Sequence, residues 1–346
     1  MREVSERAVP GSEAPFGSIT DVSGIGVGHH HRSNQRWKTG TTVVTAAHGA
    51  TPGVDVRGGG PGTRETDALR PENLINTIHA ITLTGGSAFG LAAADGVMSV
   101  MEERGLGFPI AGGIVPVVPA AVIFDLGRGG EFANRPDAEF GARAARAALS
   151  LRSSRWGAVG AGTGARAGGL QGGVGTASIL IDLGGQPLHV GALAVVNSNG
   201  SVVDPATALP WEQGELSMHR PSLAERQAVQ RAASGTQVSL NTTIGVVATS
   251  ARLSKAEASK VATVAHDGLA RAIRPAHSMT DGDSIFSMAT GTTALADDPA
   301  VRIPSINAIL RAAADAFALA CTHALLSAAT VGNAPAWRDL CPNSLA

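Results

Sequence analysis

The hydrophobic and polar positions of this chain alternate between two kinds of segment. Short apolar runs rich in β-branched residues predict strands, and longer stretches with apolar residues at helical spacing predict helices. The predicted strands cover residues 26–29, 41–45, 78–84, 178–182, 189–196, 244–247 and 285–289, with a further short strand from Val54 and an extended, proline-marked segment at 116–125. The predicted helices cover residues 88–103, 138–149, 222–233, 254–273 and 306–329, and two of them begin with the capping boxes Ser222-x-x-Glu225 and Ser254-x-x-Glu257. This order of mixed strands and paired helices predicts a layered α/β sandwich with its helices outside.

The strand at 244–247 follows directly on Asn241, Thr242 and Thr243. If the peptide bond between Asn241 and Thr242 breaks, Thr242 gains a free α-amine next to its own hydroxyl. An amine with a pKa of about 7.7 to 8.0 can act as the base that activates this hydroxyl. Thr242 is therefore a candidate for nucleophile and base in one residue. The same tripeptide also fits a polar turn, or a glycosylation acceptor if the protein is secreted.

Composition narrows the classes of function. A chain of 346 residues with 44% hydrophobic content can bury a core in one large domain or two ordinary ones. The net charge is -1, so the chain lacks the excess of positive charge that is typical of proteins that bind nucleic acid or an anionic membrane. We therefore expect neither as a partner. The chain has no tyrosine, and its only lysines are Lys38, Lys255 and Lys260. Mechanisms that need a tyrosine are therefore excluded.

The expected location is the cytoplasm. Residues 1–18 read as a flexible tail without the apolar centre of a signal peptide, and no uninterrupted apolar run reaches membrane-spanning length. Neither Cys321 nor Cys341 has neighbours at metal-ligand spacing, which fits a reduced protein. The run His29–His31 cannot converge on one ion within a strand, because adjacent side chains point to opposite faces. We expect no metal and no cofactor.

Three other motifs suggest chemistry of their own. Ser87 follows a strand and two glycines and precedes a helix, which approaches a nucleophile elbow, but the second flanking glycine is replaced by Phe89. The stretch 160–165 matches a dinucleotide fingerprint, but the many glycines after it disfavour the helix that a nicotinamide site requires. Asp281 and Asp283 by themselves fit a solvated turn, or a pair that holds a cation or orients an amine.

Five motifs taken together are more specific than any one of them. They are TGGSAFGLAAADGV, GAVGAGTGARAGGLQGGVGTAS, VVNSNGSVVDP, NTTIGVV and HDGLARAIRPAHSMTDGD. From about Ile19 to Thr290 the chain resembles the L-aminopeptidase/D-esterase family of self-processing hydrolases, which includes β-aminopeptidases and nylon-oligomer hydrolase. The resemblance implies a four-layer αββα sandwich like that of N-terminal-nucleophile hydrolases, in one hydrolase domain over residues 1–346. It also implies a homo-oligomer, a tetramer of αβ protomers.

The resemblance assigns roles to individual residues. It implies cleavage between Asn241 and Thr242, which gives an α subunit of residues 1–241 and a β subunit of residues 242–346. Thr242 is then the nucleophile, Asn197 the amide that binds the oxyanion, and Asp281 and Asp283 the assisting carboxylates. Each role is chemically sound, because an amide N–H donates to a developing oxyanion and a carboxylate orients an amine.

The chain departs from the family pattern in two places. Phe124 stands where several members have a tyrosine, and Gly169 and Gln171 stand where members commonly have a lysine. The loss of these two assisting groups bears on the rate of processing and on the substrate.

The implied function is hydrolysis of an amide or ester that frees the N-terminal residue of a short peptide or peptide-like substrate through an acyl-threonine intermediate. Two alternatives stay open: an acyltransferase that hands the same acyl group to an amine, and a catalytically silent protein that binds a small molecule in the glycine-rich pocket. The sequence does not define the preferred side chain or its stereochemistry.

Overall fold

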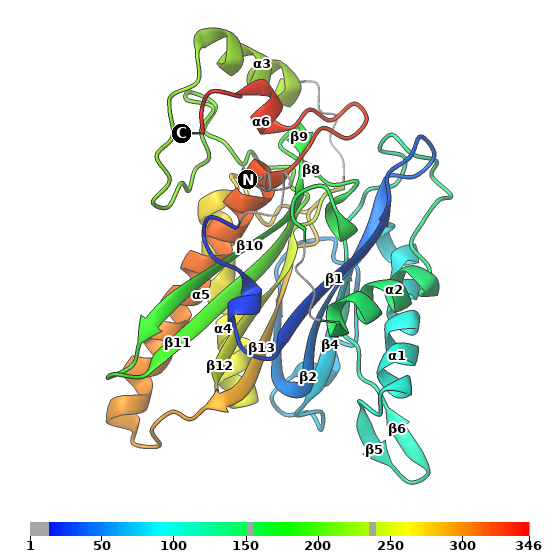
Figure 1. Ribbon diagram of the computed structural model, residues 1–346, viewed down its shortest axis with the longest axis vertical. Coiled ribbons are helices and arrows are strands. Elements are labelled where there is room, and N and C mark those ends of the chain that lie inside the picture. The colour runs from blue at the N-terminus through cyan, green and yellow to red at the C-terminus, as the bar shows by residue number, and fades with distance from the viewer. Residues whose placement is uncertain (1–13, 151–154, 235–239, 346) are drawn as a thin grey trace, which may run out of the picture.

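The computed structural model describes residues 14–150, 155–234 and 240–345, and within them the strands form a nine-stranded sheet (Figure 1). The strand order is β10-β11-β12-β13-β2-β4-β7-β3, and β1 pairs with β2 beside this path. The bounds of these strands are β1 Ile25–Arg32, β2 Thr39–Val56, β3 Thr63–Arg64, β4 Ile78–Thr84, β7 Ala120–Val122, β10 Gly173–Asp182, β11 Pro187–Val196, β12 Ile244–Ala251 and β13 Ser284–Thr293.

Strand β2 connects two halves of this sheet. Its first part pairs antiparallel with β1 and β4, and residues 51–56 pair antiparallel with β13. Strand β12 runs parallel to β13 and antiparallel to β11. The sequence predicted two short strands in this region, one at residues 41–45 and one from Val54. The structure shows a single strand, because β1 and β4 pair with its first part and β13 pairs with its last part.

Helices α4 and α5 lie outside the strands on one side and α1 and α2 on the other, whereas α3 and α6 lie beyond one end of the strands (Figure 1). Helices α4 and α5 contact β2, β10, β11 and β13, whereas α1 and α2 contact β1, β2 and β4. The helix bounds are α1 Ala93–Glu103, α2 Ala138–Leu149, α3 Leu223–Ser234, α4 Lys255–Ala272, α5 Pro299–Ser327 and α6 Trp337–Leu340. Two short hairpins, β5 Phe108–Ile110 with β6 Gly113–Val115 and β8 Arg166–Ala167 with β9 Leu170–Gln171, lie beside the main sheet.

The buried side chains form three apolar layers. Leu83 of β4 and Val246 of β12 belong to a core between the two halves of the sheet. The next residue, Val247, belongs to a second core under α4 and α5 that includes Phe317, because successive strand residues face opposite sides. A third core under α1 and α2 includes Met101. Three cores between four layers confirm the predicted αββα sandwich.

Helix α5 is longer than the sequence pattern predicted. It begins at Pro299 rather than Ile306, because the carboxylate of Asp298 accepts a hydrogen bond from the N–H of Ala300 and Pro299 fits the first turn. By length and composition α5 is apolar enough to cross a membrane, but 78% of its most apolar window is buried inside this fold. Its apolar surface is thus explained by packing against β10, β11 and α4.

The predicted N-terminal tail is only partly described by the structure. Residues 1–13 lie outside the described residues. In the remaining part, the carbonyl of Phe16 accepts a hydrogen bond of 2.8 Å from the N–H of Ser178, and Ser18 caps a short 3₁₀ helix at Ile19–Asp21. The chain is therefore attached to β10 before residue 18.

Candidate functional site

Thr242 lies two residues before β12, where this strand emerges between β11 and β13. Its backbone N–H donates to the carbonyl of Asn197 at 2.6 Å, and the N–H of Asn241 donates to the carbonyl of Thr280 at 3.0 Å. Thr242 is 5% exposed and Asn241 is 4% exposed. The two residues are thus fixed between the end of β11 and the loop before β13. The structure brings the predicted cleavage site next to Asn197.

The carbonyl oxygen of Asn241 accepts two hydrogen bonds. One comes from the N–H of Gly282 at 3.1 Å, and the other from the hydroxyl of Thr242. A side chain at position 282 is excluded, because a Cβ there would lie 2.8 Å from Oγ1 of Thr242 and 2.8 Å from the carbonyl of Gly60. Gly282 thus lets a backbone donor approach the bond that is predicted to break. The sequence analysis missed this residue, although its place between two aspartates was a signal.

Asp283 fixes the loop that faces Thr242. Its Oδ1 accepts a hydrogen bond of 2.8 Å from the N–H of Thr243. Its Oδ2 accepts one of 3.1 Å from the N–H of His277 and lies 2.8 Å from Nδ1 of the same residue. Asp283 is 2% exposed, so the interpretation of these aspartates as a solvated turn is wrong. The carboxylate instead connects the start of β12 to the loop before β13.

Asp281 is equally buried but uses only one of its oxygens. Its Oδ2 accepts hydrogen bonds from the N–H of Ser278 at 2.9 Å and from its hydroxyl at 2.7 Å. Its Oδ1 is buried and has no hydrogen-bond partner among the described residues. A buried carboxylate oxygen normally has a donor. Asp281 therefore has an unused acceptor oxygen, on a residue that lies beside Asn241.

Asn197 is completely buried directly after β11. Its Oδ1 accepts hydrogen bonds from the guanidinium of Arg128 and, at 3.0 Å, from the N–H of Arg166. Two donors on one side fix the orientation of the amide. Its Nδ2 is then a donor, and the acceptor that it has, the carbonyl of Phe124, is 3.4 Å away. A long hydrogen bond of this kind is easily exchanged for a stronger one to an oxyanion.

Arg128 is a site residue that the sequence analysis missed. Besides Asn197, its guanidinium donates to the carbonyl of Leu240 at 2.7 Å and to Oδ1 of Asn241 at 2.8 Å. Burial lowers the pKa of Arg128 to about 10, while the nearby Asp125 acts in the opposite direction. The guanidinium therefore stays charged at neutral pH. Nothing in the sequence marks Arg128 beyond its place in a glycine-flanked loop.

Asp125 is a third buried acid, three residues before Arg128. One of its carboxylate oxygens accepts a hydrogen bond of 2.7 Å from the N–H of Gly86. Burial raises the pKa of Asp125 to about 6, although the hydrogen bond from Gly86 and the charge of Arg128 lower it. Asp125 is thus the negative group that partly balances Arg128.

A hollow of about 120 Å³ opens over the predicted cleavage site. It is lined by Gly60, Pro61, Gly62, Ser87, Ala88, Val122, Phe124, Leu240, Asn241 and Thr242. Ser87 has a backbone φ of 50°, which is uncommon for a residue with a side chain and often marks a functional position. Ser87 thus lines the same hollow as Thr242.

The two departures from the family pattern lie differently in the structure. Phe124 lines the hollow, where its ring offers no hydrogen-bond donor. Gln171 lies elsewhere, and its side-chain amide donates to the carbonyls of Ala165 at 2.9 Å and Gly172 at 3.1 Å. Gln171 therefore holds the glycine-rich loop instead of reaching the reacting groups.

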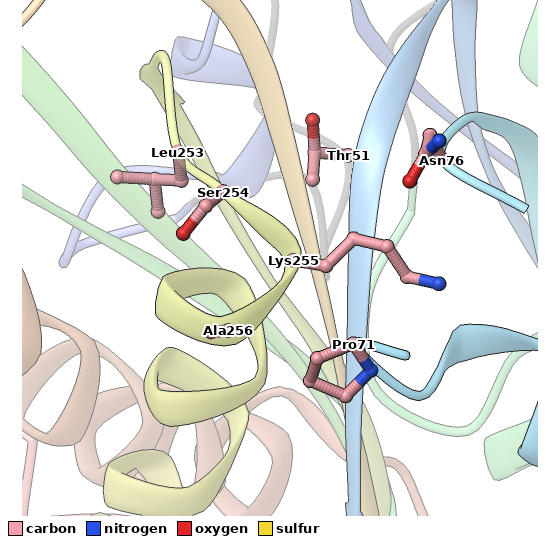
Figure 2. Close-up of a pocket in the computed structure, with 7 residues that line it drawn as sticks. All are labelled: Thr51, Pro71, Asn76, Leu253, Ser254, Lys255 and Ala256. Carbon is pink, nitrogen blue, oxygen red and sulfur yellow. The ribbon is translucent and has the colours of Figure 1, made fainter. Parts of the chain in front are cut away.

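A larger hollow of about 450 Å³ lies at the start of α4. Figure 2 shows the side chain of Lys255 extending away from α4 toward the side of Pro71 and Asn76. Its Nζ donates to the carbonyl of Asn73 at 2.8 Å, so the amine holds the loop before β4. None of the residues around this hollow lines the one over Thr242. Among the residues the structure describes, no three His, Cys, Asp or Glu side chains are placed to hold a metal ion.

The αββα sandwich is the layered fold of N-terminal-nucleophile hydrolases, and Thr242 lies just before one of its central strands. The chain belongs to peptidase family S58, whose model matches residues 17–336. This confirms the resemblance on which the residue roles are based.

Similar proteins of known name are consistent with this family assignment. An uncharacterized aminopeptidase of Mycobacterium leprae is 48% identical over 351 residues, which cover 96% of each chain. A 6-aminohexanoate-oligomer endohydrolase of a Kocuria species is 28% identical over 286 residues, 81% of this chain and 76% of that one. The structure of the L-aminopeptidase D-Ala-esterase/amidase of Ochrobactrum anthropi matches with a TM-score of 0.69 at 20% identity, over 91% of this chain and 87% of that one. That structure is described as a variant of the Ntn hydrolase fold.

Proposed function

We propose that this protein cuts its own bond between Asn241 and Thr242 and then acts as an aminopeptidase or amidohydrolase with Thr242 as its nucleophile. The observation that carries the proposal is the carbonyl of Asn241, which accepts hydrogen bonds from the Thr242 hydroxyl and from the N–H of Gly282. The hydroxyl is thus beside the bond to be cut, and a donor already polarises its carbonyl.

The first reaction is an N-to-O acyl shift. Oγ1 of Thr242 attacks the carbonyl carbon of Asn241, the C–N bond breaks, and the hydroxyl proton passes to the departing amine. Water then hydrolyses the resulting ester, leaving a carboxylate on Asn241 and a free amine on Thr242. Cyclisation of the Asn241 side chain is the competing route. It is disfavoured because Arg128 holds Oδ1 of this amide at 2.8 Å.

Turnover uses the same groups. The free amine of Thr242 takes the proton of its hydroxyl, which attacks the substrate carbonyl and forms an acyl-threonine ester. The amine then protonates the leaving group, and water releases the acyl part. Nδ2 of Asn197 is the proposed donor to the oxyanion, and the free Oδ1 of Asp281 is a proposed partner of the ammonium form. The expected substrates are short peptides and peptide-like amides or esters.

Burst kinetics with a chromogenic aminoacyl amide test this proposal. Processed protein should release one equivalent of chromophore rapidly and then turn over steadily, whereas Thr242→Ala should do neither. An added amine that accelerates release and appears in the product would identify an acyltransferase. Processed protein that binds the amide without any release would contradict the proposal and support a silent binding protein.

A further inference from the structure

We propose that Arg128 selects substrates whose acyl part carries an oxygen acceptor beyond the carbonyl under attack, either on its side chain or in the next amide unit. The inference rests on the proposed function and names a substrate class for it. Arg128 contacts the two residues on the acyl side of the predicted cleavage site, Leu240 and Asn241, and both contacts are to oxygen.

The uncut chain shows how an acyl group lies in this site. In self-cleavage, Asn241 is the acyl residue that becomes bonded to Oγ1 of Thr242, and in turnover the substrate's acyl residue takes the same bond. The groups around Asn241 are therefore available to the substrate. Its N–H donates to the carbonyl of Thr280, its carbonyl accepts from the N–H of Gly282, and its side-chain oxygen accepts from Arg128.

Departure of residues 240 and 241 changes the environment of Arg128. Two acceptors then leave a guanidinium that is partly buried, and its charge is disfavoured by burial and by Arg166. The guanidinium keeps its hydrogen bond to Oδ1 of Asn197. Loss of an acceptor by a buried, charged donor costs more than the hydrogen bond itself contributes, so a substrate that replaces the lost acceptors is favoured. An apolar acyl residue of the same size offers no replacement.

The two residues differ in how tightly they are enclosed. Asn241 is 4% exposed, whereas Leu240 is 50% exposed. The site thus encloses the acyl residue itself but recognises the preceding unit only through its carbonyl. The small hollow, lined in part by Gly60, Gly62 and Ala88, fits a short side chain. Asparaginyl and aspartyl groups meet both conditions, whereas leucyl groups have a similar size but lack the acceptor.

A matched pair of substrates tests the inference. Asparagine and leucine p-nitroanilides have side chains of similar shape, and only the first has the acceptor. Processed wild-type protein should show kcat/KM about tenfold or more higher for asparagine, the size expected of one hydrogen bond to a charged group. The ratio should fall to about one in Arg128→Met and lie between these values in Arg128→Lys.

The control is Arg36→Met, which removes an exposed arginine paired with Glu131 and should leave the ratio unchanged. Each ratio comes from one preparation, so it does not depend on the fraction that has matured. If Arg128→Met remains uncut, the wild-type ratio and that of Arg128→Lys still decide. Equal rates, or a preference for leucine, in the wild type would overturn the inference.

Failure of the proposed function gives a different result. If the protein is not a hydrolase, processed protein cleaves neither anilide. The preference of the site is then measured by ligand binding. N-acetyl-asparagine amide should still raise the melting temperature of wild-type protein more than N-acetyl-leucine amide, and Arg128→Lys should reduce this difference. An equal shift with both amides would overturn the inference as well.

Discussion

The backbone carbonyl of Asn197 accepts a hydrogen bond of 2.6 Å from the backbone N–H of Thr242. This bond lies just beyond the antiparallel pairing of β11 with β12, which ends with Val195 opposite Ile244. Sheet pairing thus places the candidate oxyanion donor next to the candidate nucleophile, although the two residues are far apart in the sequence. Loss of pairing at this end would separate them.

The first prediction concerns self-cleavage. Purified protein should separate under denaturing conditions into fragments 1–241 and 242–346. Thr242→Ala should abolish the cut because the attacking hydroxyl is gone, whereas Asn241→Gln should only slow it. Intact mass spectrometry during incubation measures both. Cleavage that survives in Thr242→Ala but is lost in Asn241→Gln would show that the asparagine side chain drives the reaction.

The second prediction concerns the proposed hydrogen bond from Asn197 to the oxyanion. Asn197→Ala should lower kcat by about 10² to 10³ with little change in KM, because one oxyanion donor acts mainly on the transition state. Steady-state kinetics on fully processed protein measure this. A variant with nearly full kcat would show that Asn197 serves only to hold Thr242 and Arg166 through its backbone and side-chain oxygen.

Gly282 makes the third prediction. Gly282→Ala should slow self-cleavage strongly, because the new Cβ would lie 2.8 Å from Oγ1 of Thr242 and from the carbonyl of Gly60. Gly113→Ala is the matched control, since a Cβ there meets nothing within 4 Å. Gel analysis of processing over time compares the two. Equal rates would mean that the loop moves away before the bond is cut.

The fourth prediction concerns the α-amine that Thr242 gains in the proposed cleavage. The amine must be unprotonated to act as a base, so kcat/KM should rise with pH through an apparent pKa near the 7.7 to 8.0 that is roughly normal for an α-amine. Asp281→Asn should move this value downward, because a nearby carboxylate favours the ammonium form. A pH–rate profile that is flat over this range would argue for another base.

His29 makes the fifth prediction, which concerns stability. Burial lowers its pKa to about 3, and its Nε2 is buried without a partner among the described residues. The folded chain therefore keeps His29 neutral while the unfolded chain takes up a proton below about pH 6.5. The free energy of unfolding should fall as the pH drops from about 6.5 to 3, by at most about 5 kcal/mol from this residue.

Chemical denaturation at a series of pH values measures this effect. His29→Gln can keep the contact with Thr42, which lies 2.9 Å from Nδ1 of the imidazole, but cannot titrate. Its unfolding free energy should depend less steeply on pH than that of the wild type. The exposed His48→Gln is the control and should behave like the wild type. Identical slopes in all three proteins would contradict the prediction.

The sequence by itself determined most of the elements and the central motif of the site. Short apolar runs indicated β4, β11 and β12, and capping boxes at Ser222 and Ser254 marked the starts of α3 and α4, where the structure shows the expected reciprocal hydrogen bonds. These signals are local, because they depend on side chains within one or two turns or on one strand. The family motifs added Thr242, Asn197 and the two aspartates.

Only the tertiary structure decided which groups meet. Strand β2 is continuous because β13 pairs with residues 51–56, a contact that no local pattern contains. The same is true of Arg128, which reaches Leu240 and Asn241 from a distant loop. Asp281 and Asp283 look solvated in the sequence but are buried, because neighbouring strands and loops enclose them. Convergence of this kind depends on sheet register and on long-range packing, and composition and spacing do not encode either one locally.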